Sequence, residues 1–148
     1  MFDEIYFLKD SGAVTVTGFG TVDASAQVVN VGSGLVRGNV IFDIDAVKVS
    51  ANDEIYTLFL MGGSDASFTQ EVSLCSKEIG AAGALQGNLD SKISKVILAF
   101  QNEERGIHYP YMRIKHVISG TSPSINYRAR LEKDLPFHGW TSFATTTT

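Results

Sequence analysis

The chain has one cysteine, little helical periodicity and no long apolar run, and each shortage excludes a class of protein. Because Cys75 is the only thiol, no disulfide can form within the chain and nothing requires an oxidising compartment. No stretch approaches the roughly 18 apolar residues of a membrane span, and the N-terminal MFDEIYFLKD is acidic where a signal peptide is basic. We therefore expect a soluble protein that folds in a reducing cytoplasm.

Positive charge is also scarce. The 148 residues include 12 Lys and Arg against 16 Asp and Glu, a net charge of −4, whereas nucleic-acid-binding domains usually carry net positive charge or a dense basic patch. Hydrophobic residues make up 44% and charged residues 19%, which is a globular composition. A chain of this length predicts one domain, placed at residues 13–134 between an N-terminal arm (1–12) and a C-terminal arm (135–148).

Strand patterns fill most of the chain. The one helix-tolerant segment, residues 76–95, is interrupted by glycines that each cost about 1 kcal/mol in a helix. Elsewhere, alternating or continuously apolar segments are bounded by Gly, Asn, Asp and Ser, as in strands joined by turns. About eight strands are expected, over residues 13–17, 26–31, 39–49, 54–62, 68–79, 95–100, 106–118 and 124–132. Along 39–49, alternation puts Val40, Phe42, Ile44 and Ala46 on one face and Ile41, Asp43, Asp45 and Val47 on the other. Their spacing predicts an all-β fold, an antiparallel jelly-roll-like β-sandwich with extended N- and C-terminal arms.

The segment GIHYPYMRIKHVI (106–118) has one apolar face and one basic, aromatic face when it is read as a strand. The apolar positions are Met112, Ile114 and Ile118, with His116 among them, and the other face carries Tyr109, Tyr111, Arg113 and Lys115. The next strand repeats the pattern, with Arg128 and Arg130 on its polar face.

These four basic side chains meet if the two strands form a hairpin. With Ile118 opposite Ile125, Lys115 faces Arg128 and Arg113 faces Arg130, and each opposed pair destabilises the sheet by a fraction of a kcal/mol to about 1 kcal/mol. Acids of the same fold such as Asp43 and Asp45, together with solvent, are the favoured way to neutralise such a patch. A protein partner is the second interpretation and a nucleic-acid groove the third.

No group of residues predicts an enzyme. His108 and His116 lie about 26 Å apart along one strand, too far to share a metal, and His116 is expected to be a neutral histidine hydrogen-bonded in or near the core. Asp43 and Asp45, about 6.6 Å apart along a strand, resemble a glycosidase carboxylate pair, but salt bridges to the basic face are favoured. The glycine-rich stretch before Arg37 lacks the lysine and hydroxyl of a phosphate loop and is read as a loop that carries Arg37.

Large aromatic side chains lie near both ends of the chain. Phe2 and Tyr6 precede the first expected strand, and Phe137, Trp140 and Phe143 lie in a polar, low-complexity tail. Such side chains bury about 150–250 Å² each when packed and promote aggregation when left in water. They are expected either to fold back on the sandwich or to anchor on a neighbouring molecule.

Three long runs carry a resemblance to a known family. They are VNVGSGLVRGNVIFDIDAVKVSANDEIYTLFLMGGSDASF, EIGAAGALQGNL and FQNEERGIHYPYMRIKHVISGTSPSINYRARL. With their glycine loop before a long alternating strand, their N-E-x-x-G-x-x-Y-P-Y strand entry and their Gly-Thr turn into I-N-Y, they resemble the jelly-roll capsid cement, or decoration, proteins of tailed bacteriophages. The resemblance covers residues 26–132 and leaves the tail from Phe137 without a counterpart.

The resemblance implies a non-enzymatic virion protein on the capsid surface, made in the cytoplasm of a host bacterium. Such proteins form homotrimers that clamp adjacent major capsid protein subunits at three-fold and quasi-three-fold positions. The expected partners are therefore further copies of the chain and the major capsid protein, with no cofactor, nucleic acid, membrane or small-molecule substrate. The candidate partner-binding residues are Phe2, Tyr6, Arg37, Tyr109, Tyr111, Arg113, Lys115, Arg128, Arg130, Phe137, Trp140 and Phe143.

Two alternatives stay open from the sequence. A carbohydrate-binding jelly-roll module would use exposed aromatics such as Tyr109, Tyr111 or Trp140 as stacking platforms, with Asp43 and Asp45 as hydroxyl acceptors. A structural component of a phage neck or tail is also compatible with a small β-sandwich.

Overall fold

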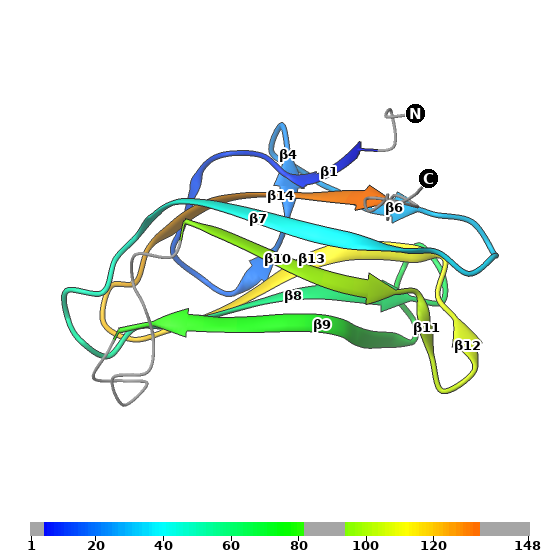
Figure 1. The fold of residues 1–148 in the computed structure, drawn as a ribbon. Helices are drawn as coiled ribbons and strands as arrows, with labels where there is room; N and C mark the ends of the chain where they lie inside the picture. The colour runs from blue at the N-terminus through cyan, green and yellow to red at the C-terminus, as the bar shows by residue number, and fades with distance from the viewer. Residues whose placement is uncertain (1–4, 82–93, 134–148) are drawn as a thin grey trace, which may run out of the picture.

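A computed structural model describes residues 5–81 and 94–133. Within these ranges the chain is all-β, and two antiparallel sheets pack face to face (Figure 1). The predicted β-sandwich is therefore confirmed.

The first sheet runs in the order β1-β14-β7-β10, and the second in the order β3-β13-β8-β9. The first contains β1 (Ile5–Lys9), β14 (Ile125–Lys133), β7 (Arg37–Val47) and β10 (Lys95–Gln101), with β2 (Ala13–Val14) pairing beside β14. The second contains β3 (Gly18–Phe19), β13 (Tyr111–Ser119), β8 (Ile55–Gly63) and β9 (Glu71–Gly80), with β6 (Val29–Asn30) pairing beside β13. Two small ladders join β4 (Thr21–Val22) to β5 (Ser25–Ala26) and β11 (Glu103–Glu104) to β12 (Ile107–His108).

The long strands change sheet at nearly every connection. The chain passes from β7 in the first sheet to β8 and β9 in the second, then to β10 in the first, β13 in the second and β14 in the first. This alternation puts strands that are neighbours in the sequence on opposite sides of one core, as in a jelly roll.

The beginning of the sandwich lies earlier than predicted. Residues 5–9, assigned from sequence to an arm over residues 1–12, form β1, which pairs with β14 from Ile5 opposite Glu132 onward. Leu8 is fully buried on this strand, so the segment belongs to the core. Conversely, the strands expected over 13–17 and 26–31 shrink to two-residue ladders. The predicted arm over residues 135–148 lies outside the described residues.

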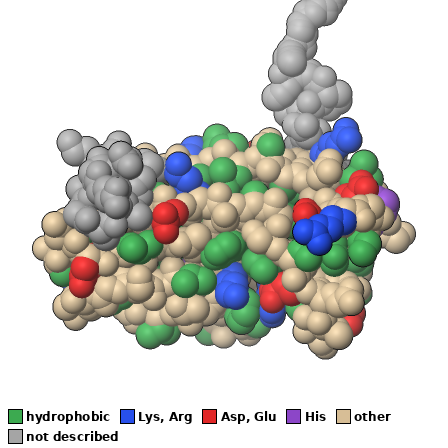
Figure 2. Space-filling view, turned by 90° about the horizontal axis from the view of Figure 1, so that it is seen from below, with side chains coloured by type: hydrophobic (Ala, Val, Ile, Leu, Met, Phe, Trp, Pro, Cys, Tyr) green, Lys and Arg blue, Asp and Glu red, His purple; other side chains and the backbone are tan. Residues whose placement is uncertain are grey.

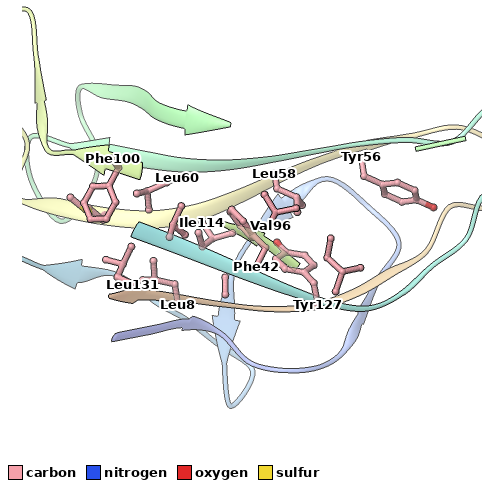
Figure 3. Close-up of a cluster of buried hydrophobic side chains, with 14 of the residues drawn as sticks. Leu8, Phe42, Tyr56, Leu58, Leu60, Val96, Phe100, Ile114, Tyr127 and Leu131 are labelled. Atoms are coloured by element: carbon pink, nitrogen blue, oxygen red, sulfur yellow. The ribbon is translucent and has the colours of Figure 1, made fainter. Parts of the chain in front are cut away.

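Apolar side chains from both sheets fill the space between them (Figure 3). The strands alternate as predicted, so every second residue faces the other sheet, and burying each such side chain contributes about 1.5–3 kcal/mol. The largest fully buried side chains include Leu8, Phe42, Tyr56, Leu58, Leu60, Met112, Ile114 and Tyr127.

A bulge in β7 changes the predicted alternation. Phe42 and Ile44 face the core as expected, but the register with β14 shifts after Ile44 and leaves Asp45 as the extra residue. Beyond the bulge the faces exchange, so Ala46 is exposed and Val47 packs against the core, the reverse of the prediction.

A buried polar network joins the two sheets. His116 of β13 is 3% exposed, and its Nδ1 lies 2.7 Å from the Tyr127 hydroxyl on β14, so the prediction of a hydrogen-bonded core histidine is confirmed. The Lys9 ammonium is 4.4 Å from the centre of the Tyr127 ring and donates to the carbonyls of Asp10, Gly12 and Tyr127. All three side chains therefore have partners despite their burial.

Candidate interaction surfaces

The predicted four-residue basic patch does not form. β13 and β14 lie in different sheets, β13 beside β8 and β14 between β1 and β7, so the predicted hairpin register is wrong. Both strands turn their apolar faces to the same core, which sends their polar faces to opposite sides of the sandwich. Arg113 and Lys115 lie on the outer face of the second sheet, and Arg128 and Arg130 on that of the first.

Arg113 is held within the outer face of the second sheet. Its guanidinium carbon lies 3.8 Å from the centre of the Phe19 ring and 4.1 Å from that of Phe68. Nε and Nη2 donate to Glu71 Oε2 at 3.1 and 2.9 Å. The absence of a side chain at Gly63 leaves room for the Phe68 ring. Arg113 therefore orders its own surface, and the aromatic and acidic partners that hold it were not predicted from sequence.

The same face carries exposed apolar side chains around Lys115. Lys115 is half-buried and stands between Phe19 and Phe59 in the strand register. Phe19 is 41% exposed and Val117, farther along β13, is 37% exposed. Figure 2 shows the side on which β8 and β9 lie, where hydrophobic side chains occur between scattered charged ones.

On the outer face of the first sheet, Asp43 forms ion pairs with two basic side chains. It accepts a hydrogen bond from Arg130, which also donates to Glu132 at 3.0 Å, and its second oxygen lies 3.7 Å from Lys95 Nζ. These hydrogen bonds and charges raise the pKa of Arg130 against the opposing effect of burial. Arg128 lies opposite Asp43 in the register and is exposed, without an ion pair among the described residues. The predicted salt-bridge role is therefore confirmed for Asp43, whereas Asp45 accepts a hydrogen bond from Ser11 and has no ion pair within residues 5–81 and 94–133.

A hollow of about 340 Å³ lies beside this cluster. It is lined by Phe7, Asp43, Arg128, Ala129, Arg130 and Glu132. Phe7 is 54% exposed and Ile97, two strands beyond Arg130 in the same row, is 57% exposed. The first sheet therefore also presents apolar side chains around paired charges.

The remaining predicted residues have separate positions. Tyr109 is 5% exposed and its N–H donates to the Asn102 carbonyl at 2.7 Å, so its ring is part of the fold and not a free platform. Tyr111 is half-buried at the start of β13, and Arg37 is exposed at the start of β7. Tyr6 lies on β1 opposite Leu131. Phe2, Phe137, Trp140 and Phe143 lie outside the described residues.

Metal-ligating side chains do not cluster in the described ranges. No group of three or more His, Cys, Asp and Glu side chains there could hold a metal ion. Burial raises the pKa of the Cys75 thiol to about 11, which disfavours the thiolate that a nucleophile needs. Nε2 of His108 lies 3.9 Å from the Glu103 carboxylate.

No protein-family model matches the chain, and no curated protein or solved structure matches it. Among the described residues there is no helix of the length and apolarity that crossing a membrane requires.

Proposed function

We propose that the protein is a structural capsid cement protein, which attaches to the outside of a phage head and clamps adjacent major capsid protein subunits. The observation that carries the proposal is a filled jelly-roll-like sandwich with apolar side chains exposed on both outer faces, Phe7 and Ile97 on one and Phe19 and Val117 on the other. The sequence resemblance to phage decoration proteins supplies the class of partner.

Two outward faces suit a clamp better than they suit a ligand-binding module. The side chains of the core occupy the space between the sheets, so a small molecule has no interior site among the described residues. Exposed apolar side chains beside paired charges are typical of surfaces that contact other proteins. A protein with such side chains on both faces can contact more than one neighbour at once.

We further propose that the working form is a homotrimer at three-fold and quasi-three-fold positions of the shell. A trimer engages several capsid subunits at once, and such multivalent attachment can exceed the affinity of a single site by about 10²–10⁴-fold. Light scattering should then give about three times the chain mass of 16.0 kDa, either in solution or after release from shells.

Co-sedimentation with expanded phage heads that lack decoration protein tests the proposal. Wild-type protein should sediment with the shells, and Val117→Asp should reduce the bound amount because it puts a charge on the outer face of the second sheet. Ser50→Asp, at an exposed turn before β8, is the matched control for the added charge. The truncation of residues 137–148 and Trp140→Ala test in the same assay whether the tail anchors the protein. Wild-type protein that stays in the supernatant with every shell would contradict the proposal.

The sugar-binding alternative receives less support from the described surface. Tyr109 is buried, so its ring is not available to stack on a sugar, and Asp43 is already paired with Arg130. Specific signals on a glycan array, or calcium-dependent sugar binding, would favour this alternative over the capsid role. Rings with other than three-fold symmetry would favour a neck or tail component.

A further inference from the structure

Three of the four edges of the sandwich carry features that prevent pairing with another chain. On the first sheet, β1 has a register shift between Phe7 and Lys9, and β2 is two residues long. On the second sheet, β3 and β6 are equally short, and β9 has an extra residue, Leu74, where its register with β8 shifts. Short strands and bulges are common means of blocking edge-to-edge association.

The fourth edge, β10, has none of these features. Its seven residues pair with β7 without a register shift, and they include no proline or glycine. Its one charged residue, Lys95, leans toward β7, because its ammonium lies 3.7 Å from Asp43. Ile97 is 57% exposed in the middle of the strand. Within residues 5–81 and 94–133, no strand pairs with the far side of β10.

The hydrogen-bond pattern shows which backbone groups of β10 face outward. At the two ends of the ladder, Ile44 N donates to Ser94 O at 2.8 Å and Asn102 N donates to Val36 O at 3.1 Å. Residues in an antiparallel pair alternate between bonded and non-bonded positions, so the even-numbered residues of β10 bond to β7. The odd-numbered residues therefore direct their N–H and C=O groups to the open side. They are Lys95, Ile97, Ala99 and Gln101.

We propose that a second copy of the chain pairs with this edge, β10 against β10, antiparallel and about a two-fold axis at Leu98. Each copy then contributes all four outward-facing residues to the shared ladder. A register centred on Ile97 or Ala99 uses only three of them. The first sheet continues from one copy into the other.

The strand is complementary to itself in this register. Lys95 faces Gln101 of the second copy, so no like charges oppose each other, and Ile97 faces Ala99 of the second copy on the outer surface. The contact is isologous, as in most homodimers. It covers the exposed Ile97 side chain and satisfies the open backbone groups at the same time.

A single engineered cysteine tests the contact and its register. In a Cys75→Ser background, Leu98→Cys places two thiols opposite each other at a non-hydrogen-bonded pair, where Cα atoms lie about 4.5 Å apart and within disulfide range. Ser76→Cys, at an exposed position on the bulged edge strand β9, is the control. The expected result is a disulfide-linked dimer from Leu98→Cys under mild oxidation and none from Ser76→Cys.

Like charges placed opposite each other test the same contact by disrupting it. Adding Ile97→Lys and Ala99→Lys to the Leu98→Cys variant sets lysine against lysine across the axis, and the linked dimer should be lost. A dimer that persists with these lysines, one that forms equally from Ser76→Cys, or no dimer at all would overturn the proposal. The last result is also expected if another segment of the chain, or another protein, covers the edge.

A second measurement serves if Leu98→Cys fails to fold, as judged by thermal melting. Light scattering on the full chain should give a mass for Ile97→Lys/Ala99→Lys that is at most half of the wild-type mass at the same high concentration. Ser50→Lys, at the exposed turn before β8, should leave the mass unchanged. Equal masses for the double-lysine variant and wild type would refute the pairing.

The two-fold contact does not rest on the proposed capsid role. It uses a different axis from a three-fold contact, so copies of neighbouring trimers could pair in the same way. The disulfide test reports the β10 contact whether or not the protein binds shells, and the shell assay reports attachment whether or not β10 pairs.

Discussion

Acid should destabilise this protein through one buried histidine. His116 faces the core from β13, with the Tyr127 hydroxyl at Nδ1 and the Lys9 ammonium over the ring of the same tyrosine. Burial, and then the positive charge of Lys9, lower the pKa of His116 from 6.5 to about 4. The folded protein therefore holds this imidazole neutral at a pH where an unfolded chain protonates it.

The size and direction of the effect follow from this difference in pKa. Between about pH 6.5 and about pH 4 the unfolded state binds more protons at this position, so the free energy of unfolding falls as the pH falls. The contribution of neutral His116 to the free energy of unfolding is fully present above pH 6.5 and is lost by about pH 4. A depression of this size corresponds to about 3 kcal/mol, a large part of the stability of a small domain.

Urea unfolding from about pH 7 to about pH 4 measures the effect, with His116→Gln compared with wild type. Glutamine keeps a side chain that can hydrogen-bond to Tyr127, and it does not titrate. Wild type should lose about 3 kcal/mol more than the variant over this range, since carboxylates titrate in both proteins and largely cancel. His108→Gln, at an exposed histidine on β12, should follow wild type. Parallel curves for wild type and His116→Gln would refute the reasoning.

Three further predictions concern packing. Arg113→Lys should lower the free energy of unfolding by about 1–2 kcal/mol, because an ammonium cannot both donate a fork to Glu71 and lie flat between two rings; an unchanged urea midpoint would contradict this. Gly120→Ala should lower the free energy of unfolding by more than about 1 kcal/mol, because φ is 114° there and a Cβ would lie 2.7 Å from a backbone atom. Gly34→Ala is the control and should have a smaller effect, because no atom lies within 4 Å of the added Cβ. Phe42→Ala should cost about 3–5 kcal/mol in thermal or urea unfolding, and a loss below about 1 kcal/mol would show that the core closes around the gap.

Periodicity along single strands was enough to predict much of the fold. The alternating pattern of residues 106–118 correctly put Met112 and Ile114 in the core, and the pattern of 39–49 did the same for Phe42. Which face of a strand is buried depends on that strand's own residues, so the alternation of apolar and polar residues predicts it.

Sheet membership could not be read in the same way. Residues 111–119 and 125–133 turn apolar faces to one core whether they pair as a hairpin or cross to opposite sheets, so the pattern is the same in both cases. The contacts of the basic residues depend on that choice. Arg113 meets Phe19, Phe68 and Glu71 only because two distant segments, β3 and residues 68–71, converge on it.

The shortest elements had no usable signal. β2, β3 and β6 are two residues long, and two residues cannot establish a period. The bulge at Asp45 exchanges the two faces of β7, and no glycine or proline there indicates a bulge in the sequence. Strict alternation therefore assigns Ala46 to the core face and Val47 to the outer face, the reverse of what the structure has.

The hydrogen bond from His116 to Tyr127 also bears on how the two layers resist sliding. Most contacts between the sheets are apolar, and apolar contacts tolerate small translations because they have little directional preference. A 2.7 Å hydrogen bond between residues of different layers loses most of its strength if one layer shifts by an ångström or two. The pair therefore opposes sliding of one layer against the other.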